Sequence, residues 1–223
     1  MKIVIIIILF LILLAILFLV NKKYENFKNN NTLFFIHIPK NAGTSIEDVA
    51  KKHNINWGRF YSFNINDKYK KCSKWHIPPK YYENDYKNKK LFCIVRNPYT
   101  RIVSEFKYSH QGEQNKENLN KWIKSLPHEF NNNKFLNDCH LLPQTEFIKN
   151  KDDSINKEIE ILRFENLNID FKNLLNKYNY KDMKLPMNNK SKVNLTHRDL
   201  NNESKNIIKK IYKTDFETFD YPM

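Results

Sequence analysis

Two short loops concentrate residue types that this chain otherwise uses rarely. The 223 residues include only three glycines, yet Gly43 lies in "HIPKNAGTS" (37–45), beside a lysine, a threonine and a serine. Two of the five arginines, Arg96 and Arg101, fall within "RNPYTR" (96–101). Basic, hydroxyl and glycine residues in one turn are the usual means of holding a phosphate-like anion. These loops are therefore the first candidates for a binding site.

The first loop lies between an apolar run and a segment with helical spacing. The first turn of a helix has unpaired N–H groups and a partial positive charge, which suit an anion. Gly43 would let the backbone approach a phosphate, Lys40 would supply an ammonium group, and Thr44 and Ser45 would supply hydroxyl donors. The alternative is an ordinary strand-to-helix turn. A Walker A motif is excluded because Lys40 precedes the only nearby glycine, and the glycine count excludes GxGxxG.

The second loop places Arg96 at the end of the apolar run "LFCIV", and Ser104 follows eight residues later. Asn97 can cap the helix that starts there, and Pro98 suits its first position. A guanidinium and a hydroxyl could then converge on a second phosphate. The alternative is a capped helix with a surface arginine.

The elements that must position these loops alternate between strands and helices. Apolar runs predict strands at 32–38, 91–95 and 159–164, while helical spacing predicts helices at 44–54, 97–110, 117–126, 168–179 and 200–216. The Asn-rich stretch 128–138 reads as a loop. This alternation predicts an α/β fold with a mostly parallel central sheet flanked by helices. Ligands of such sheets bind beyond the carboxyl ends of the strands.

Four segments divide the chain. A two-residue tail (1–2) precedes an unbroken apolar run, 3–20, that as a helix would span about 27 Å and so predicts a transmembrane signal anchor. A cleaved signal peptide is the alternative, but no small-residue cleavage site follows. A polar tether (21–32) then leads to a single domain (33–223). Lysines after the apolar run weakly favour a cytosolic domain.

Charge and cysteine usage limit the function further. The net charge of +14 suggests anionic partners such as phosphates, acidic glycans, nucleic acid or a membrane surface. The chain is loaded with Lys, Asn and Ile throughout, so part of this charge reflects composition alone. Its three cysteines, Cys72, Cys93 and Cys139, form no CxxC, so no metal site is expected. A Cys72–Cys139 disulfide is one option in an oxidising compartment, and Cys93 reads as a buried thiol.

Together the two loops resemble the PAPS-dependent sulfotransferases, where PAPS is 3′-phosphoadenosine 5′-phosphosulfate. "HIPKNAGTS" is similar to their 5′-phosphosulfate loop, and "RNPYTRIVS" to their 3′-phosphate motif, with the same Arg-to-Ser interval. The likeness is closest to the membrane-anchored carbohydrate sulfotransferases of the Golgi. Further similar stretches are "HLLPQTEFI" (140–148), "ILRFENL" (161–167) and "IYKTDFETFDY" (211–221).

The resemblance implies a P-loop-like sulfotransferase fold, PAPS as co-substrate without a metal, and a carbohydrate acceptor, acidic glycans included. No nucleic acid partner is expected. It also implies a type II, single-pass membrane protein with its domain in the Golgi lumen. Arg96 and Ser104 would hold the 3′-phosphate. The 5′-phosphosulfate would be wrapped by Lys40, Asn41, Ala42, Gly43, Thr44 and Ser45. The stretch "LPMNNKSKVN" (185–194) departs from relatives that often carry a histidine there.

Sulfuryl transfer needs a group that neutralises the leaving phosphate and a base that takes the acceptor's proton. Lys40 fits the first role. The resemblance favours His76 as the base, because some relatives that act on uronic acid units have a histidine in the corresponding segment. Glu47 is the runner-up.

The remaining candidates for the base are His53, His110 and His140. His140 and Gln144 could also line an acceptor groove, and His37 could fix the end of the first strand.

The sequence is also compatible with two other functions. One is a membrane-tethered basic protein that binds glycans or nucleotides without catalysis, such as a decayed enzyme. The other is a nucleotide-dependent kinase, against which the missing Walker A spacing counts. The acceptor itself and the oligomeric state are not readable from these residues.

Overall fold

A computed structural model describes residues 11–20, 33–64, 72–132, 135, 137–180, 182–185 and 193–223. Residues 11–20 are helical. The first part of the predicted membrane span and the tether (21–32) lie outside the described residues. Among those described, no helix is both long enough and apolar enough to cross a membrane.

A three-stranded parallel sheet forms the centre of the domain, in the order β1 (Leu33–Ile36), β2 (Lys90–Val95), β3 (Glu160–Arg163). Branched and aromatic side chains dominate these strands, and the whole of β1 is buried. Phe35 pairs with Phe92 across the first ladder. The predicted mixed α/β fold with parallel strands is confirmed, and the described sheet is small.

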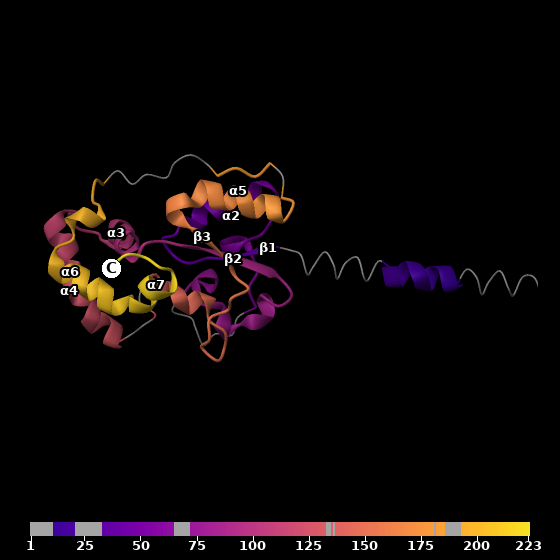
Figure 1. Ribbon diagram of the computed structural model, residues 1–223, viewed down its shortest axis with the longest axis horizontal. Coiled ribbons are helices and arrows are strands. Elements are labelled where there is room, and N and C mark those ends of the chain that lie inside the picture. The colour runs from indigo at the N-terminus through magenta and orange to yellow at the C-terminus, as the bar shows by residue number, and fades with distance from the viewer. Residues whose placement is uncertain are drawn as a thin grey trace, which may run out of the picture.

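Helices flank the sheet as the apolar spacing predicted (Figure 1). α2 (Gly43–Lys52) follows β1, and α3 (Pro98–Ser109) follows β2. α5 (Leu167–Lys177) follows β3 and packs against it. The Asn97 side chain accepts a hydrogen bond from the N–H of Tyr99, so the predicted cap of α3 is confirmed.

Two predicted boundaries were wrong. α4 (Lys116–Asn132) passes through Pro127 into the Asn-rich stretch that was expected to be a loop. Its apolar stripe continues to Phe130, whose ring lies 6.4 Å from that of Tyr212, and this packing outweighs the lost hydrogen bond at proline.

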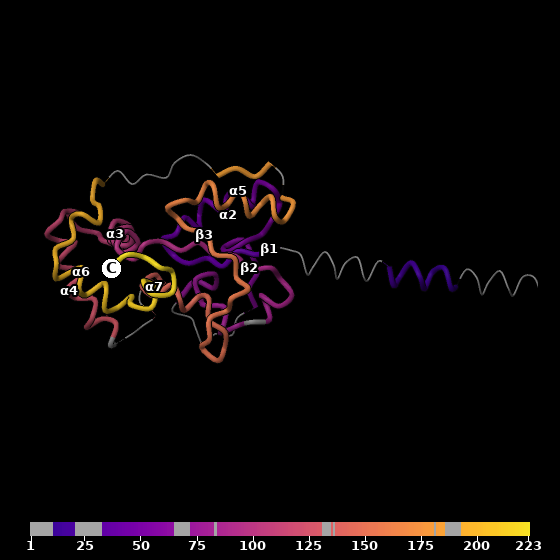
Figure 2. The backbone as a smooth tube through the Cα atoms, in the orientation of Figure 1, coloured from indigo at the N-terminus to yellow at the C-terminus, as the bar shows by residue number. Residues whose placement is uncertain are grey.

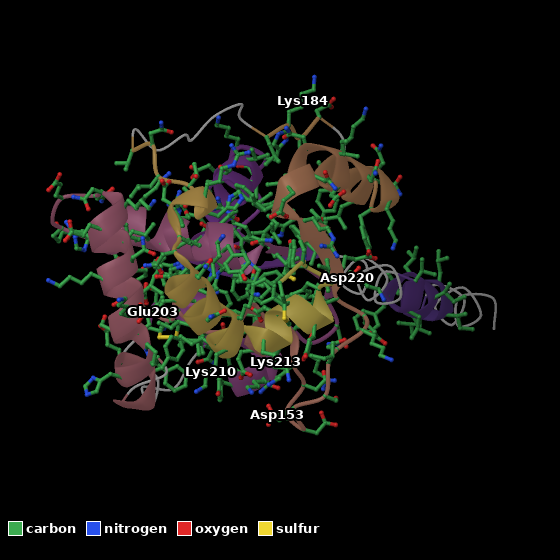
Figure 3. All side chains as sticks on the ribbon, turned by 60° about the vertical axis from the view of Figure 1, so that its left-hand side comes forward. Asp153, Lys184, Glu203, Lys210, Lys213 and Asp220 are labelled. Atoms are coloured by element: carbon green, nitrogen blue, oxygen red, sulfur yellow. A yellow bond between two sulfur atoms is a disulfide. The ribbon has the colours of Figure 1, made fainter. Side chains whose placement is uncertain are left out.

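The segment predicted as one helix at 200–216 is two, α6 (Asn202–Ile211) and α7 (Lys213–Thr218). The chain turns at Tyr212, which is buried and donates its hydroxyl hydrogen to the Leu141 carbonyl at 2.9 Å. Both helices are yellow in Figure 2. The charged side chains labelled in Figure 3 are all exposed.

A disulfide joins Cys72 to Cys139, and Cys93 is a buried free thiol in β2. The optional pairing named from the sequence is therefore the one formed. It ties segment 72–76, which ends in the short 3-10 helix η3 (Lys74–His76), to segment 137–142, which belongs to no helix or strand.

Candidate active site

The two predicted loops line one cavity of about 1210 Å³. They come together because β1 and β2 are parallel neighbours, so the connections after both strands leave the same edge of the sheet. Ligand pockets in proteins usually measure about 300–1,000 Å³. This cavity is therefore large enough for a nucleotide together with part of a second substrate.

The first loop enters α2 through two left-handed residues, Lys40 (φ 68°) and Ala42 (φ 65°). Such conformations cost about 1–2 kcal/mol each for residues with a Cβ. Their persistence implies that surrounding contacts hold the loop in this shape. The loop, through Thr44 and Ser45, lines the cavity where the first N–H groups of α2 have no intrahelical acceptor.

Gly43 lines the cavity, and its φ is not in the left-handed region. A Cβ added here would lie 2.3 Å from Nε2 of His37. Glycine is thus needed at this position so that the buried His37 ring can pack under the loop.

Asn41 turns its side chain away from the cavity. Its Nδ2 donates to the Ile94 carbonyl and to Oε1 of Gln144, both at 2.7 Å. Gln144 in turn accepts from the backbone N–H of Arg96 and donates to its carbonyl. The idea that Gln144 lines an acceptor groove is wrong: it is fully buried and joins the two loops. Only the backbone of Asn41 remains available to a ligand.

Arg96 and Ser104 both line the cavity. The guanidinium of Arg96 donates to Oγ1 of Thr100 and to the Lys40 carbonyl, and it stacks 3.9 Å from the Phe164 ring centre. Burial lowers the pKa of Arg96 to about 10, still well above neutral. A fixed positive charge therefore faces the cavity beside the first loop.

Arg101, the other arginine of this cluster, has a structural role. Its guanidinium is buried and donates to three carbonyls, those of Pro39, His140 and Leu142. It thereby fastens the start of the first loop to segment 137–142.

Lys40 lies in the cavity with its ammonium group 3.6 Å from the centre of the Tyr108 ring. Burial lowers its pKa to about 8, with Arg96 and Arg101 acting in the same direction and Glu105 opposing them. A bound anion would stabilise the charged form of this ammonium group and raise its pKa again.

His76 lines the cavity and is paired through Nδ1 with Oδ2 of Asp138 at 2.8 Å. Asp138 also accepts hydrogen bonds from the Ser73 backbone N–H and hydroxyl. The hydrogen bond with His76, followed by those with Ser73, lowers the pKa of Asp138 to about 2 against the effect of burial. Burial lowers the pKa of His76 to about 4, despite the hydrogen bond to Asp138, which acts in the opposite direction. The imidazole is therefore neutral at physiological pH and its Nε2 can accept a proton.

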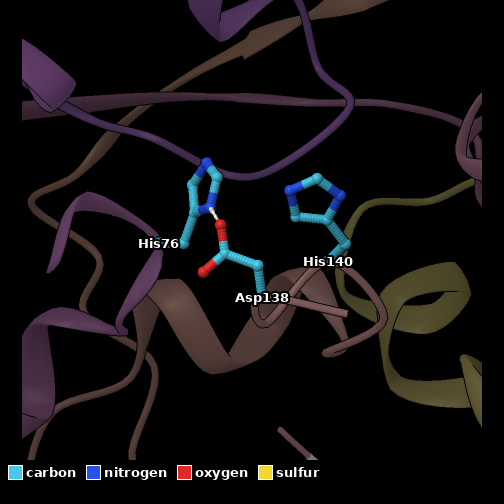
Figure 4. A group of neighbouring side chains, drawn as sticks. All are labelled: His76, Asp138 and His140. Atoms are coloured by element: carbon cyan, nitrogen blue, oxygen red, sulfur yellow. Dashed lines mark hydrogen bonds and ion pairs between the residues drawn. The ribbon is translucent and has the colours of Figure 1, made fainter. Parts of the chain in front are cut away.

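Three such histidine–carboxylate pairs stand in a row along the cavity. His37 pairs with Glu47 at 2.6 Å, and His140 pairs with Glu105 at 2.8 Å, each through Nδ1. The His76 ring lies between the other two, with centroid distances of 4.7 Å to His37 and 4.9 Å to His140. Figure 4 shows one nitrogen of His140 turned towards His76.

Of the other candidates for the base, Glu47 is fully buried and already accepts hydrogen bonds from His37 and from the backbone N–H of Arg59. Both bonds are accepted by Oε1, and Oε2 lies 3.6 Å from Nε of Arg59. His53 is exposed at the end of α2, and His110 stacks on Phe106. Neither His53 nor His110 is among the described residues that line the cavity.

His76, Asp138 and His140 each offer a ligand atom within 4.8 Å of the others. Two ligands of a zinc ion, at about 2.1 Å each, can stand at most about 4.2 Å apart. The Asp138 carboxylate is moreover already engaged by His76 and Ser73. The geometry thus fits a hydrogen-bonded pair better than a formed metal site.

Sequence reasoning missed Asp138, Glu105, Tyr108 and Phe164. Each acts through a partner distant in sequence, and although Phe164 lies in the similar stretch "ILRFENL" (161–167), that likeness gave it no role. The C-terminal stretch that departs from relatives falls largely outside the described residues, but 193–197 lines the cavity.

Comparison with known proteins gives one match. A family model described as the sulfotransferase family matches residues 26–222, nearly the whole chain. No curated protein and no solved structure matches.

Proposed function

The chain belongs to the sulfotransferase family, and we propose that it transfers the sulfuryl group of PAPS to a hydroxyl group of a carbohydrate. The main support is the shared cavity, in which an anion-binding loop and a buried arginine lie with a neutral, carboxylate-paired histidine. The residues suited to bind the anionic donor and the residue suited to accept the proton thus line the same cavity.

The residues present fit a donor with several negative charges. Lys40, Arg96, Thr44, Ser45 and Ser104 all line the cavity with hydrogen-bond donors. The carboxylates that also line it, Glu47 and Asp138, already have hydrogen-bonded partners. The cavity therefore presents surplus donors and positive charge to an anion.

We assign the 5′-phosphosulfate to the turn from Lys40 to Ser45 and the 3′-phosphate to Arg96 and Ser104. PAPS supplies an activated sulfuryl group. Lys40 stabilises negative charge on the bridging oxygen as the bond between that oxygen and sulfur breaks. No covalent bond to the protein is needed, because positioning and charge stabilisation suffice for such transfers.

We assign the proton of the acceptor hydroxyl to Nε2 of His76. The hydroxyl oxygen forms the new bond to sulfur while its proton moves to the imidazole. Asp138 holds Nδ1 of that ring, which keeps Nε2 free as the acceptor and stabilises the imidazolium that results. A general base contributes about 10²–10⁴-fold to the rate.

Ligand binding followed by transfer tests the proposal. Isothermal titration of the full-length protein with PAPS, adenosine 3′,5′-bisphosphate and ATP should show preference for the two 3′-phosphorylated ligands. Radiolabelled sulfate should then pass from PAPS to at least one of a panel of desulfated glycans. Preference for ATP with metal-dependent hydrolysis would point to a kinase, and tight PAPS binding without transfer to any acceptor to a binding protein.

We also propose that the domain lies in the Golgi lumen, anchored by residues 3–20. The Cys72–Cys139 disulfide supports an oxidising compartment, because structural disulfides are rare in the cytosol. Protease added to intact microsomes should leave the domain uncut. Digestion without detergent would contradict this topology.

A further inference from the structure

His140 is a second cavity histidine that the proposed transfer does not use. It lies on segment 137–142, and its Nδ1 hydrogen-bonds to Glu105 of α3. Glu105 is 1% exposed, and its second carboxylate oxygen has no hydrogen-bond partner among the described residues. Burying a carboxylate is costly unless it is paired. A histidine that needed only to pack would not require such a partner.

The position of His140 places it between the two ends of the reaction. Its ring lies 5.4 Å from that of Tyr108, which carries the Lys40 ammonium group on its face. The His140 ring also lies 4.9 Å from that of His76. Lys40 is assigned to the leaving group and His76 to the attacking hydroxyl, so His140 borders the space where the acceptor must enter.

Both histidines offer the same chemistry. A carboxylate that accepts from Nδ1 holds a proton on that nitrogen, so an imidazole paired in this way offers Nε2 as a hydrogen-bond acceptor whenever the ring is neutral. The two ring centroids lie 4.9 Å apart, and one nitrogen of His140 is turned towards His76 (Figure 4). Two neighbouring hydroxyl groups of a sugar ring, each donating to one nitrogen, can span such a separation.

We propose that His140 binds the hydroxyl group next to the one that is sulfated, so that the acceptor carries two free neighbouring hydroxyls. This inference rests on the proposed function and narrows its acceptor class. The hydroxyl on His140 keeps its proton and serves as a binding contact, while only the hydroxyl facing His76 reacts. A tyrosine side chain, with a single hydroxyl, cannot make both contacts.

Monodeoxy acceptors test the inference. From the desulfated glycans that accept sulfate, a disaccharide acceptor is chosen and the position sulfated is determined. Matched analogues then lack the hydroxyl on either side of that position. For the wild type, kcat/KM should fall about 10–100-fold for one of these analogues, because a site built to bind a hydroxyl rejects the ligand that lacks it.

The variant His140→Phe keeps a ring and removes the acceptor nitrogen. With the parent disaccharide, its kcat/KM should fall by a factor similar to the one that the wild type loses with the sensitive analogue. Changing the variant's substrate to that analogue should cause almost no further loss, because the variant and the analogue each remove the same contact. His140→Gln, which retains an acceptor atom, should keep part of the activity. Affinity for adenosine 3′,5′-bisphosphate should stay unchanged in both, which also reports that they are folded.

Separate results overturn the inference and the proposed function. If wild-type protein transfers sulfate but tolerates removal of either neighbouring hydroxyl, or if the losses from His140→Phe and from the analogue multiply, His140 does not bind that hydroxyl. Preference for a tyrosyl peptide would overturn the inference as well. Absence of any transfer by the wild type would instead remove the proposed function.

Discussion

Breaking the Cys72–Cys139 disulfide should damage catalysis more than donor binding. The bridge closes a loop with a sequence separation of 67 residues. Cys72 lies four residues before His76, and Cys139 stands directly between Asp138 and His140 in the sequence. Asn137, Asp138 and Cys139 all have left-handed backbone, with φ of 47°, 57° and 63°. Such backbone suits Asn and Asp but costs about 1–2 kcal/mol at a residue such as cysteine.

For a loop of this length, the bridge lowers the entropy of the unfolded chain, and its removal should lower the free energy of unfolding by about 4 kcal/mol at 25 °C. That value is an upper bound if the unfolded chain keeps residual structure. Without the bridge the left-handed turn can relax, and Asp138 then leaves Nδ1 of His76. Turnover should fall by up to the contribution of a general base, about 10²–10⁴-fold. Arg96 and the first loop are held by other contacts, so affinity for adenosine 3′,5′-bisphosphate should change little.

Two perturbations test this reasoning, reduction of the wild type with dithiothreitol and the double variant Cys72→Ala/Cys139→Ala. Urea unfolding followed by circular dichroism gives the stability, titration gives the affinity, and radiolabelled transfer gives the turnover. Cys93→Ala is the matched control, because it removes a buried thiol of β2 that takes no part in the disulfide. If the reduced protein keeps wild-type turnover, or loses affinity and turnover in parallel, the bridge does not position His76.

Further predictions concern the donor site and its protonation. Arg96→Ala should weaken adenosine 3′,5′-bisphosphate by about 1.5–3 kcal/mol, with no further large loss when the 3′-phosphate is removed; an unchanged affinity by titration would contradict this assignment. Gly43→Ala should weaken the same ligand because its Cβ meets the His37 ring, whereas Gly112→Ala, in an exposed position, should bind as the wild type does. The pH profile of kcat/KM should fall on the acid side near pH 4, as His76 gains a proton, and on the alkaline side near pH 8, as Lys40 loses one; a flat profile across both values would be inconsistent with these roles. Lys40→Ala should depress turnover far more than affinity for the bisphosphate product, and equal losses would reduce Lys40 to a binding residue.

The arrangement of the two loops was predictable because it follows from local patterns. Apolar runs mark β1 and β2, each run ends in residues that start a helix, and parallel strands deliver both loops to one edge of the sheet. Composition helped, because Arg96 and Gly43 are rare residue types in a chain otherwise rich in Lys, Asn and Ile. Even here the reason for Gly43 was hidden, because it depends on a ring that packs beneath the loop.

The side chains that prepare the chemistry were not predictable, for a physical reason. His76 and Asp138 are 62 residues apart, and His140 and Glu105 are 35 apart. Neither pair lies within one helix or one ladder, so no period of the sequence relates them. Only His37 and Glu47, ten residues apart across the first loop, could have been paired from local structure.

Segment 137–142 illustrates what replaces secondary structure in this site. It carries both Asp138 and His140, yet it belongs to no helix or strand. Its position depends on the disulfide at Cys139 and on Arg101, which holds the carbonyls of His140 and Leu142. Arg101 also holds the carbonyl of Pro39, next to Lys40. A single buried guanidinium thus joins segment 137–142, which carries Asp138 and His140, to the start of the first loop. If the proposed roles hold, cross-links rather than the sheet fix the distance between the base and the donor-binding loop.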